Sequence, residues 1–239
     1  MDHNSIIKCR KCGMPLKKGT KICSYCGKRT GYLINREQKE KKNRGIQIAG
    51  HPVRIPWISL VLIVLNAFVG IYKLAGGEGN ILVRYGMIAG ALQRGEYLRL
   101  ILSGFLHTGW VHFASNMYAL VIYGIVFERR IPGWKYLLIY ITSMLGSALL
   151  INFIGGNALH IGASGAIWGL MAANLVYCLI TKRKILYMLY AVLAVAGNVV
   201  YTFSNGISWQ GHLGGAIAGI VMALLLFGKE RKRSDAEGW

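Results

Sequence analysis

The sequence predicts an all-α membrane protein with six membrane-spanning helices and a small cysteine-rich module at its N-terminus. Apolar residues make up 54% of the 239 residues and charged residues only 15%, a composition too apolar for a soluble globule. Apolar runs that approach the roughly 20 helical residues needed to cross a bilayer recur six times after Pro56. Four of the five cysteines lie within the first 30 residues, ahead of all these runs.

The positive charge of the chain follows the pattern of a membrane protein. The formal net charge is +19, which by itself would suggest a nucleic-acid partner. However, Lys and Arg crowd the first 54 residues, the short loops and the tail, as in cytoplasmic segments beside anionic lipid. We therefore expect a lipid bilayer, and no nucleic acid, as the partner of this charge.

The composition divides the chain into four parts. Residues 1–30 form the cysteine-rich module, and residues 31–54 form a charged linker that is either a short exposed helix or unstructured. Residues 55–228 form the membrane domain, and residues 229–239 a basic cytoplasmic tail. The chain opens with a polar segment and not with the pattern of a secretory signal peptide, so we expect the N-terminus to stay on the side where it is made.

Within the membrane domain, the first connection differs from the rest. Residues 76–110 are amphipathic and broken by glycines, so they are expected to form a long interfacial loop with short helices. The fourth span is short and begins directly after a glycine-containing loop. The six predicted spans cover residues 57–75, 111–128, 133–154, 164–181, 184–203 and 207–227.

The loops predict the orientation of these spans. Arg129, Arg130 and Lys135 lie between the second and third spans, and further basic residues follow the fourth and sixth. The connections at 155–163 and 204–206 contain no Lys or Arg. By the positive-inside rule both termini are cytoplasmic. Together with the short polar module, this predicts a multi-pass protein of a bacterial plasma membrane.

The N-terminal cysteines form two knuckles, Cys9 with Cys12 and Cys23 with Cys26, ten residues apart. Each pair can supply two thiolates to one tetrahedral ion, and a glycine after each second cysteine permits the tight turn. Two disulfides are the alternative, which the reducing cytoplasm disfavours. The spacing predicts a structural zinc ion outside catalysis, because four cysteines close the coordination shell. The segment resembles the short zinc-ribbon modules at the ends of many bacterial proteins.

Polar residues of the membrane domain gather at one depth. Ser164 opens the fourth span between glycines, where it could be a nucleophile or a simple helix cap. His212 lies near the start of the sixth span, and His112 and Asn116 share a face at the start of the second. All three spans run from outside to inside, so these side chains lie near the outer surface. Ionisable residues inside a span indicate a functional site.

Glycines predict that two of these spans approach closely. Gly211, Gly215 and Gly219 recur every four residues in the sixth span, and Gly165 and Gly169 do so in the fourth. Such stripes of small residues let helix backbones come close together. A short serine side chain could then reach a histidine ring within the 2.6–3.2 Å of a hydrogen bond.

Three motifs together resemble the rhomboid intramembrane proteases. Residues 105–116 resemble the second-span signature HxxxN, residues 162–165 the GxSG nucleophile motif, and residues 212–219 the motif HxxGxxxG. The resemblance covers about residues 55–228 and implies a six-helix rhomboid bundle. It also implies hydrolysis of peptide bonds in or near the transmembrane segments of membrane proteins, usually single-span ones, without a catalytic cofactor.

The resemblance assigns a role to each candidate residue. Ser164 is the expected nucleophile and His212 its general base, a dyad without an acidic third member. His112, Asn116 and the backbone N–H of Ser164 are expected to bind the oxyanion. Trp168, one turn after Ser164, is expected to pack under the His212 ring, although it could be an ordinary core residue. Supporting glycines are Gly162, Gly165, Gly215 and Gly219.

Two departures and two rival functions stay open. Leu98 replaces the tryptophan that commonly precedes the arginine of the first loop, which puts the seating of that loop in question. Glu128-Arg129 resembles a structural contact of the family, but an exposed helix end would also explain it. A pseudoprotease would usually lack the serine or the histidine, and this chain keeps both. A transporter would be expected to show discontinuous helices or inverted repeats, and the sequence shows no repeat. The zinc module could bind a cytoplasmic partner.

Overall fold

The structure, a computed structural model, describes residues 6–9, 11–17, 20–29, 47–48, 51–52, 55–74, 80–181, 185–204 and 208–236. The chain divides into two compact units, Met1–Ile55 and Pro56–Trp239. Most of the predicted linker at 31–54 lies outside the described residues, so its predicted structure is not tested.

The N-terminal unit contains two short antiparallel hairpins. Strand β1 (Ile6–Lys8) pairs with β2 (Pro15–Lys17), and β3 (Gln47–Ile48) pairs with β4 (His51–Pro52). Among its described residues, the buried cluster consists of Cys9, Leu16 and Cys23. So small an apolar cluster contributes little to folding, and units of this size usually need an added cross-link such as a bound metal.

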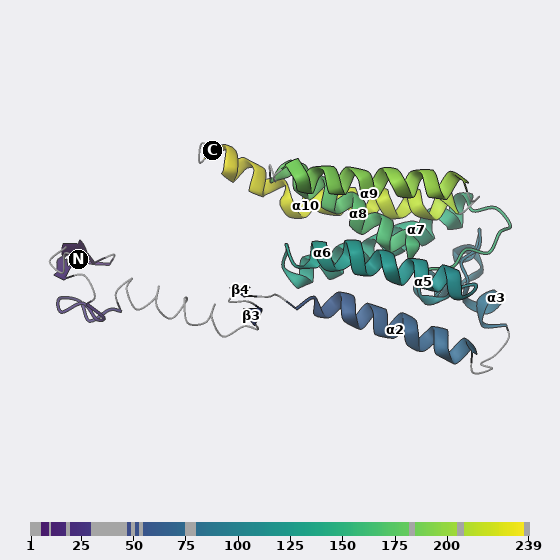
Figure 1. Cartoon of the computed structure of the whole chain (residues 1–239), viewed down its shortest axis with the longest axis horizontal. Helices are drawn as coiled ribbons and strands as arrows, with labels where there is room; N and C mark the ends of the chain where they lie inside the picture. The colour runs from purple at the N-terminus through teal and green to yellow at the C-terminus, as the bar shows by residue number, and fades with distance from the viewer. Residues whose placement is uncertain are drawn as a thin grey trace. The chain divides into compact units, whose positions relative to one another are not determined.

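The second unit is a bundle of long helices (Figure 1). Among the described residues, long helical segments occupy the ranges of the six predicted spans, and the second segment is a continuous run of α5, the π-helix η3 and α6. The helices are α2 (Trp57–Leu74), α5 (Trp110–Ala119), η3 (Leu120–Gly124), α6 (Ile125–Glu128), α7 (Gly133–Ile154), α8 (Ser164–Ile180), α9 (Ile185–Ser204) and α10 (Trp209–Ala236).

In the long first loop, the described residues from 80 onward contain only short helices, as predicted. Between α2 and α5 the chain forms two helical turns and two 3-10 turns, connected by bends. They are α3 (Ile81–Tyr85), η1 (Leu92–Arg94), α4 (Arg99–Leu102) and η2 (Ser103–Phe105).

Helix α10 extends beyond the predicted sixth span and continues through residues 229–236 of the predicted tail. Residues 229–233 are all Lys, Arg or Glu, which are good helix formers, so the backbone helix continues past the apolar sequence.

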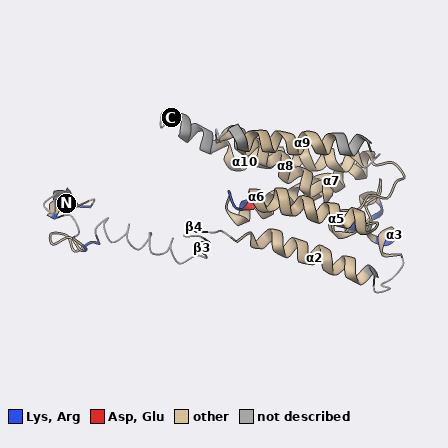
Figure 2. Cartoon of the chain, viewed as in Figure 1, with Lys and Arg blue, Asp and Glu red and all other residues tan. Residues whose placement is uncertain are grey.

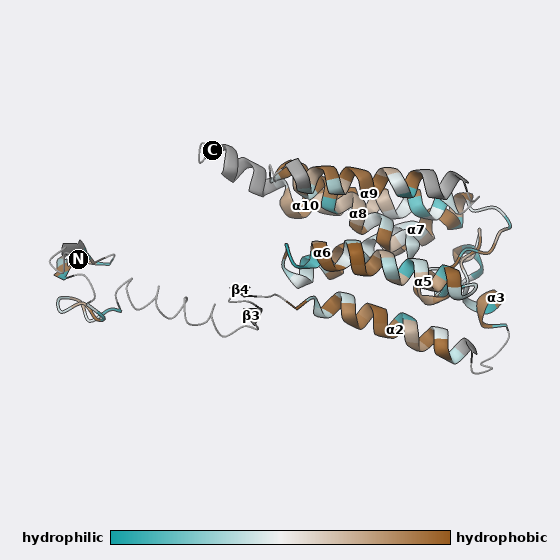
Figure 3. Ribbon diagram, viewed as in Figure 1, coloured by the Kyte–Doolittle hydropathy of each residue, from teal (hydrophilic) through white to brown (hydrophobic). Residues whose placement is uncertain are grey.

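Several of these helices are apolar over most of their length (Figure 3). Among the described residues, three are long and apolar enough to cross a membrane: Trp110–Glu128, Gly133–Ile154 and Trp209–Gly228. Three shorter apolar helices accompany them, at Trp57–Tyr72, Ser164–Ile180 and Tyr187–Val199. The molecule is therefore a mostly helical integral membrane protein.

Helix α8 forms the centre of the bundle, packed between α7 and α10. A Cβ atom at Gly215 would collide with the carbonyl oxygen of Gly165, and one at Gly219 with that of Gly169. On the side of α7, Cβ atoms at Gly165 and Gly169 would collide with serine side chains. Three helices therefore meet where α8 has no side chains, and this contact positions the N-terminal ends of α8 and α10.

Glu128 attaches helix α2 to the bundle. Its carboxylate accepts hydrogen bonds from the backbone N–H groups of Ile58 (2.9 Å) and Ser59 (2.7 Å), which lie in the first turn of α2. Only 5% of Glu128 is exposed, so it is a buried structural contact and not an exposed helix end. Figure 2 shows acidic colour at the end of α6, with Lys and Arg toward the two ends of the bundle.

Candidate active site

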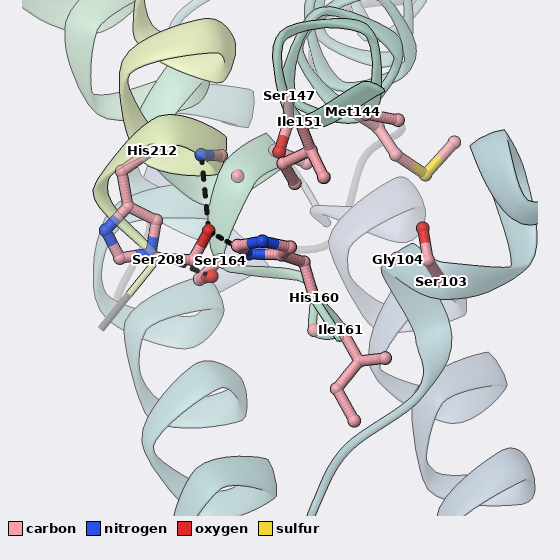
Figure 4. A pocket seen from close by; sticks show the side chains of 15 residues that line it. Ser103, Gly104, Met144, Ser147, Ile151, His160, Ile161, Ser164, Ser208 and His212 are labelled. Carbon is pink, nitrogen blue, oxygen red and sulfur yellow. Dashed lines mark hydrogen bonds between the residues drawn. The ribbon is translucent and has the colours of Figure 1, made fainter. Parts of the chain in front are cut away.

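Ser164 and His212 meet at the N-terminal end of the glycine contact between α8 and α10. Ser164 is the first residue of α8, and His212 lies in the first turn of α10. The Nε2 atom of His212 lies 2.9 Å from the Oγ atom of Ser164, within hydrogen-bond distance (Figure 4). Because helix backbones are nearly in contact at Gly165 and Gly215, two short side chains can bridge the remaining space.

The ring of Trp168 covers one face of the His212 imidazole. The two rings are stacked, with 5.2 Å between centroids and 20° between planes. Both residues are buried, with 8% of Trp168 and 6% of His212 exposed. The hydrogen bond to Ser164 and the stack on Trp168 together hold the imidazole in one orientation.

His112 and Asn116 approach the loop before Ser164 from helix α5. Gly162 in that loop has φ = +118°, a backbone conformation that favours glycine. A Cβ atom there would lie 2.8 Å from the His112 ring and 3.5 Å from the Asn116 amide nitrogen. Glycine at 162 therefore serves both the turn and the close approach of two polar side chains.

The first loop is held in place without the tryptophan that Leu98 replaces. The Arg99 guanidinium donates to the backbone carbonyls of Val83 (2.7 Å) and Gly86, and pairs with Glu96 at 2.6 Å. Leu98 itself is 63% exposed, so nothing in the described loop packs over it. Arg99 thus connects α4 to the backbone of residues 83–86.

Two cavities reach Ser164. A large cavity of about 650 Å³ lies between α5, α8 and the start of α10, with His112, Asn116 and Trp168 in its wall. A small cavity of about 30 Å³ lies behind Ser164 (Figure 4). The large one is big enough for an extended peptide segment, and the small one for a water molecule. A nucleophile at their junction could receive both substrate and water.

The same region of the chain matches a known protein family. Residues 94–229, more than half of the chain, match the rhomboid domain. The chain belongs to the rhomboid family. The resemblance carried by the three motifs is therefore confirmed.

Individual relatives of this rhomboid chain come from several bacteria. An uncharacterised protein of Mycobacterium tuberculosis is 34% identical over 148 residues, which cover 56% of this chain and 60% of the relative. The rhomboid protease AarA of Providencia stuartii is 28% identical over 200 residues, 70% of this chain and 71% of the relative. The rhomboid protease GluP of Bacillus subtilis is 28% identical over 201 residues, 81% of this chain and 39% of the relative. The matches thus span about 60% of the length of the mycobacterial relative.

The rhomboid site contains two residues that sequence reasoning missed. His160 and Ser208 line both cavities, and the His160 Nδ1 atom lies 2.5 Å from the Ser208 Oγ atom (Figure 4). A second histidine four residues before the nucleophile, in a loop without Lys or Arg, was the available signal. Ser208 carried no signal, because a serine before a helix is ordinarily a cap.

The four N-terminal cysteines lie close enough together to hold one metal ion. Their sulfur atoms all lie within 4.8 Å of one another, and the Cys9–Cys26 and Cys12–Cys23 distances are 3.8 and 3.6 Å. Four sulfurs at the 2.3 Å Zn–S bond length would lie about 3.8 Å apart in a tetrahedron. All four cysteines are free, so the disulfide alternative is not found.

The two knuckles share one backbone geometry. The N–H of Gly13 bonds the carbonyl of Cys9, and the N–H of Gly27 bonds that of Cys23, each at 2.9 Å. Both glycines have positive φ, +73° and +66°, as the predicted tight turns require. Backbone N–H groups of Cys12 and Lys11 lower the pKa of the Cys9 thiol, whereas desolvation and the other three cysteines raise the pKa of Cys12. The two matched turns bring the four sulfur atoms together as a metal ligand set requires.

Proposed function

We propose that this rhomboid chain is an intramembrane serine endopeptidase that cuts membrane proteins through a Ser164–His212 dyad. The observation that carries this proposal is the 2.9 Å contact between the Ser164 hydroxyl and the His212 Nε2 atom, inside a cavity open to a peptide. A helix cap would need no such partner. The names of two relatives, AarA and GluP, as rhomboid proteases support the same activity.

The geometry supports general-base catalysis by His212. Its Nε2 atom takes the Ser164 proton while Oγ attacks the carbonyl carbon of the scissile bond, and it then gives that proton to the leaving amine. Water in turn hydrolyses the resulting ester with His212 again as base. Trp168 keeps the ring in the plane that both transfers need.

Three donors would stabilise the oxyanion of the tetrahedral intermediate. They are the backbone N–H of Ser164, free at the start of α8, and the side chains of His112 and Asn116. The His112 Nδ1 atom lies 3.2 Å from the Thr108 hydroxyl. If that hydroxyl donates to Nδ1, the neutral ring carries its proton on Nε2, the atom nearer Gly162. The Asn116 amide gives one N–H to the His112 carbonyl at 3.0 Å and retains another.

We further propose that all six helices cross the membrane, with both termini in the cytoplasm of a bacterial plasma membrane. Helix α8 has 17 residues and a length of about 25 Å, short of a hydrocarbon core of about 30 Å. Protein surrounds it on most sides, and the large cavity lies above its first residue. Water in this cavity would thus occupy the remaining membrane thickness at the outer surface, and hydrolysis requires that water.

The substrates would be single-span membrane proteins cut near the outer surface. A peptide bond in an intact helix has paired backbone groups, so the substrate must unwind locally to reach Ser164. Glycine and other helix-weakening residues near the scissile bond would lower that barrier. We expect a small residue before the cleaved bond.

The N-terminal module would hold one structural zinc ion through Cys9, Cys12, Cys23 and Cys26. Zinc would cross-link a unit whose described residues form only a minimal apolar core, and it would supply no catalytic chemistry to the membrane domain. The module would also be able to bind a cytoplasmic partner, and its basic surface would determine which partner binds.

Cleavage of a fluorogenic single-span substrate by the purified protein tests the activity. We expect cleavage by the parent and none by Ser164→Ala or His212→Ala. Cleavage that persists in Ser164→Ala would exclude the dyad. A parent that is folded and binds the substrate without cutting it would instead be a helix-binding pseudoprotease.

A further inference from the structure

Both ring nitrogens of His160 are engaged in a way that the dyad does not require. His160 lies in the loop between α7 and α8 and is only 7% exposed. Its Nε2 atom lies 3.0 Å from the backbone carbonyl of Gly155, just after α7. Its Nδ1 atom lies 2.5 Å from the hydroxyl of Ser208, just before α10. One side chain thus connects the ends of two helices.

The bonding pattern fixes the direction of each hydrogen bond for a neutral ring. The Gly155 carbonyl only accepts, so His160 Nε2 carries the proton and donates. His160 Nδ1 then accepts from the Ser208 hydroxyl. The Ser208 oxygen in turn accepts from the backbone N–H of Gly211 at 3.4 Å, as an N-cap does. An unbroken chain of donors runs from the first turn of α10 to the end of α7.

The backbone around His160 is anchored independently of this chain. His160 exchanges two backbone hydrogen bonds of 2.8 Å with Met87 in the first loop, and Gly162 donates to the carbonyl of Ser103 at 2.9 Å. The loop that leads into Ser164 is therefore fixed on one side. Its connection to Ser208 transmits that fixed position to the start of α10, where the His212 N–H bonds the Ser208 carbonyl at 3.3 Å.

We propose that His160 and Ser208 form a brace that positions His212 relative to Ser164. The glycine contacts set the spacing of α8 and α10 on the inner side of the dyad, beginning at Gly165 and Gly215. The brace adds a second fixed point on the outer side of His212, which limits the tilt and rotation of the first turn of α10. Both residues act through His212 and are positioning residues. The role rests on the proposed protease function.

Four variants of the full-length protein test the brace by steady-state kinetics on a fluorogenic single-span substrate. His160→Phe keeps the bulk and removes both hydrogen bonds, whereas the amide of His160→Gln can still donate to Gly155 and accept from Ser208. A misplaced catalytic group lowers turnover more than substrate binding. We expect kcat to fall roughly tenfold to hundredfold in His160→Phe and in Ser208→Ala, with KM within about twofold. His160→Gln should recover most of kcat.

The double variant His160→Phe/Ser208→Ala separates a shared role from two unrelated ones. Residues that act through one hydrogen bond have non-additive effects, so its kcat should be no lower than that of the worse single variant. A loss equal to the product of the two single losses would overturn the brace. So would a kcat within about twofold of the parent in both single variants.

Hydrogen exchange tests the same contact without catalysis. The Gly211 N–H depends on the Ser208 hydroxyl, so peptides that cover residues 208–212 should take up deuterium faster in His160→Phe and Ser208→Ala. Ser59→Ala is the matched control, because Ser59 is buried and bonded to Tyr136 in the α2 contact. Unchanged uptake in both brace variants would overturn the proposal. Since this readout needs no activity, it distinguishes failure of the brace from failure of the protease function.

Discussion

A serine hydroxyl is a weak nucleophile, and the base that could activate Ser164 lies 2.9 Å away on another helix. Around this pair, each neighbouring residue has a separate task. Trp168 stacks on the imidazole, and Gly162 leaves room for His112. Because these contacts are made by different residues, their loss should have different consequences, and single substitutions can separate them.

Asn116→Ala tests the proposed oxyanion donors. Loss of one donor from an acyl-transfer site typically lowers kcat about 10²- to 10³-fold, because the donor is used mainly in the transition state. We expect a loss of this size with KM nearly unchanged, measured with a fluorogenic single-span substrate. Asn174→Ala is the control, since Asn174 is equally buried on α8 but bonds Arg130 near the other end of that helix. Equal losses in both variants would contradict the assignment.

Sequence motifs indicated these residues as candidates because the proposed chemistry restricts such roles to few residue types. They could not identify His160 and Ser208, whose contact depends on where two loops meet in space. They also left the role of Glu128 undecided. That role depends on whether Glu128 is buried, and the sequence of the second predicted span does not show that helix α2 packs against it.

At the scale of helices, the site depends on the contact between α8 and α10. Gly215 and Gly219 lie against backbone carbonyls of α8, so any side chain there pushes the helices apart. The motif with four-residue spacing predicted this contact, since the spacing repeats with the helix turn. The limits of the helices were also largely predictable from the apolar runs. The extent of α10 was not, because charged helix formers continue a helix beyond its apolar part.

Gly215→Ala should destabilise the bundle and impair the dyad together. Its methyl group would overlap the Gly165 carbonyl, and overpacking of this kind typically costs about 1–3 kcal/mol. We expect a lower thermal unfolding temperature in detergent and a lower kcat. Gly228→Ala, on the same helix with nothing within 4 Å of the added Cβ, should match or exceed the parent in stability. A Gly215→Ala protein as stable and as active as Gly228→Ala would refute the close contact.

Glu128→Ala should loosen helix α2 with little direct effect on the chemistry. It leaves the N–H groups of Ile58 and Ser59 without their acceptor, which costs about 1–3 kcal/mol. The thermal unfolding temperature should fall, and peptides that cover residues 57–62 should exchange hydrogen faster. Glu128→Gln retains one carbonyl acceptor and should fall less. Equal stability of Glu128→Ala and the parent would mean that α2 is held by other contacts.

At the scale of the whole molecule, two units with different sources of stability share one chain. The membrane unit is held by helix packing, and the N-terminal unit contains four cysteines that lie close enough to hold one metal ion. The sequence predicted both units from composition and spacing. It also predicted that the three shorter apolar helices cross the membrane, which their length of 10–17 residues does not decide.

Removal of the metal should affect only the N-terminal unit. We expect about one zinc ion per chain by elemental analysis of the purified protein and a loss of that zinc in Cys23→Ser. Cys178→Ser, which alters a buried cysteine of α8, should retain it. Reactivity of Ser164 should survive treatment with a chelator. Zinc retained at the parent level in Cys23→Ser would contradict the assigned ligands.

Labelling with a fluorophosphonate probe, followed by mass spectrometry of the modified peptide, tests the central claim most directly. The probe reacts with a serine that a base activates, whether or not the right substrate is known. We predict modification at Ser164 in the parent and none in His212→Ala, although that variant retains the serine. A folded parent that is not labelled, or a His212→Ala variant labelled as fast as the parent, would contradict the dyad.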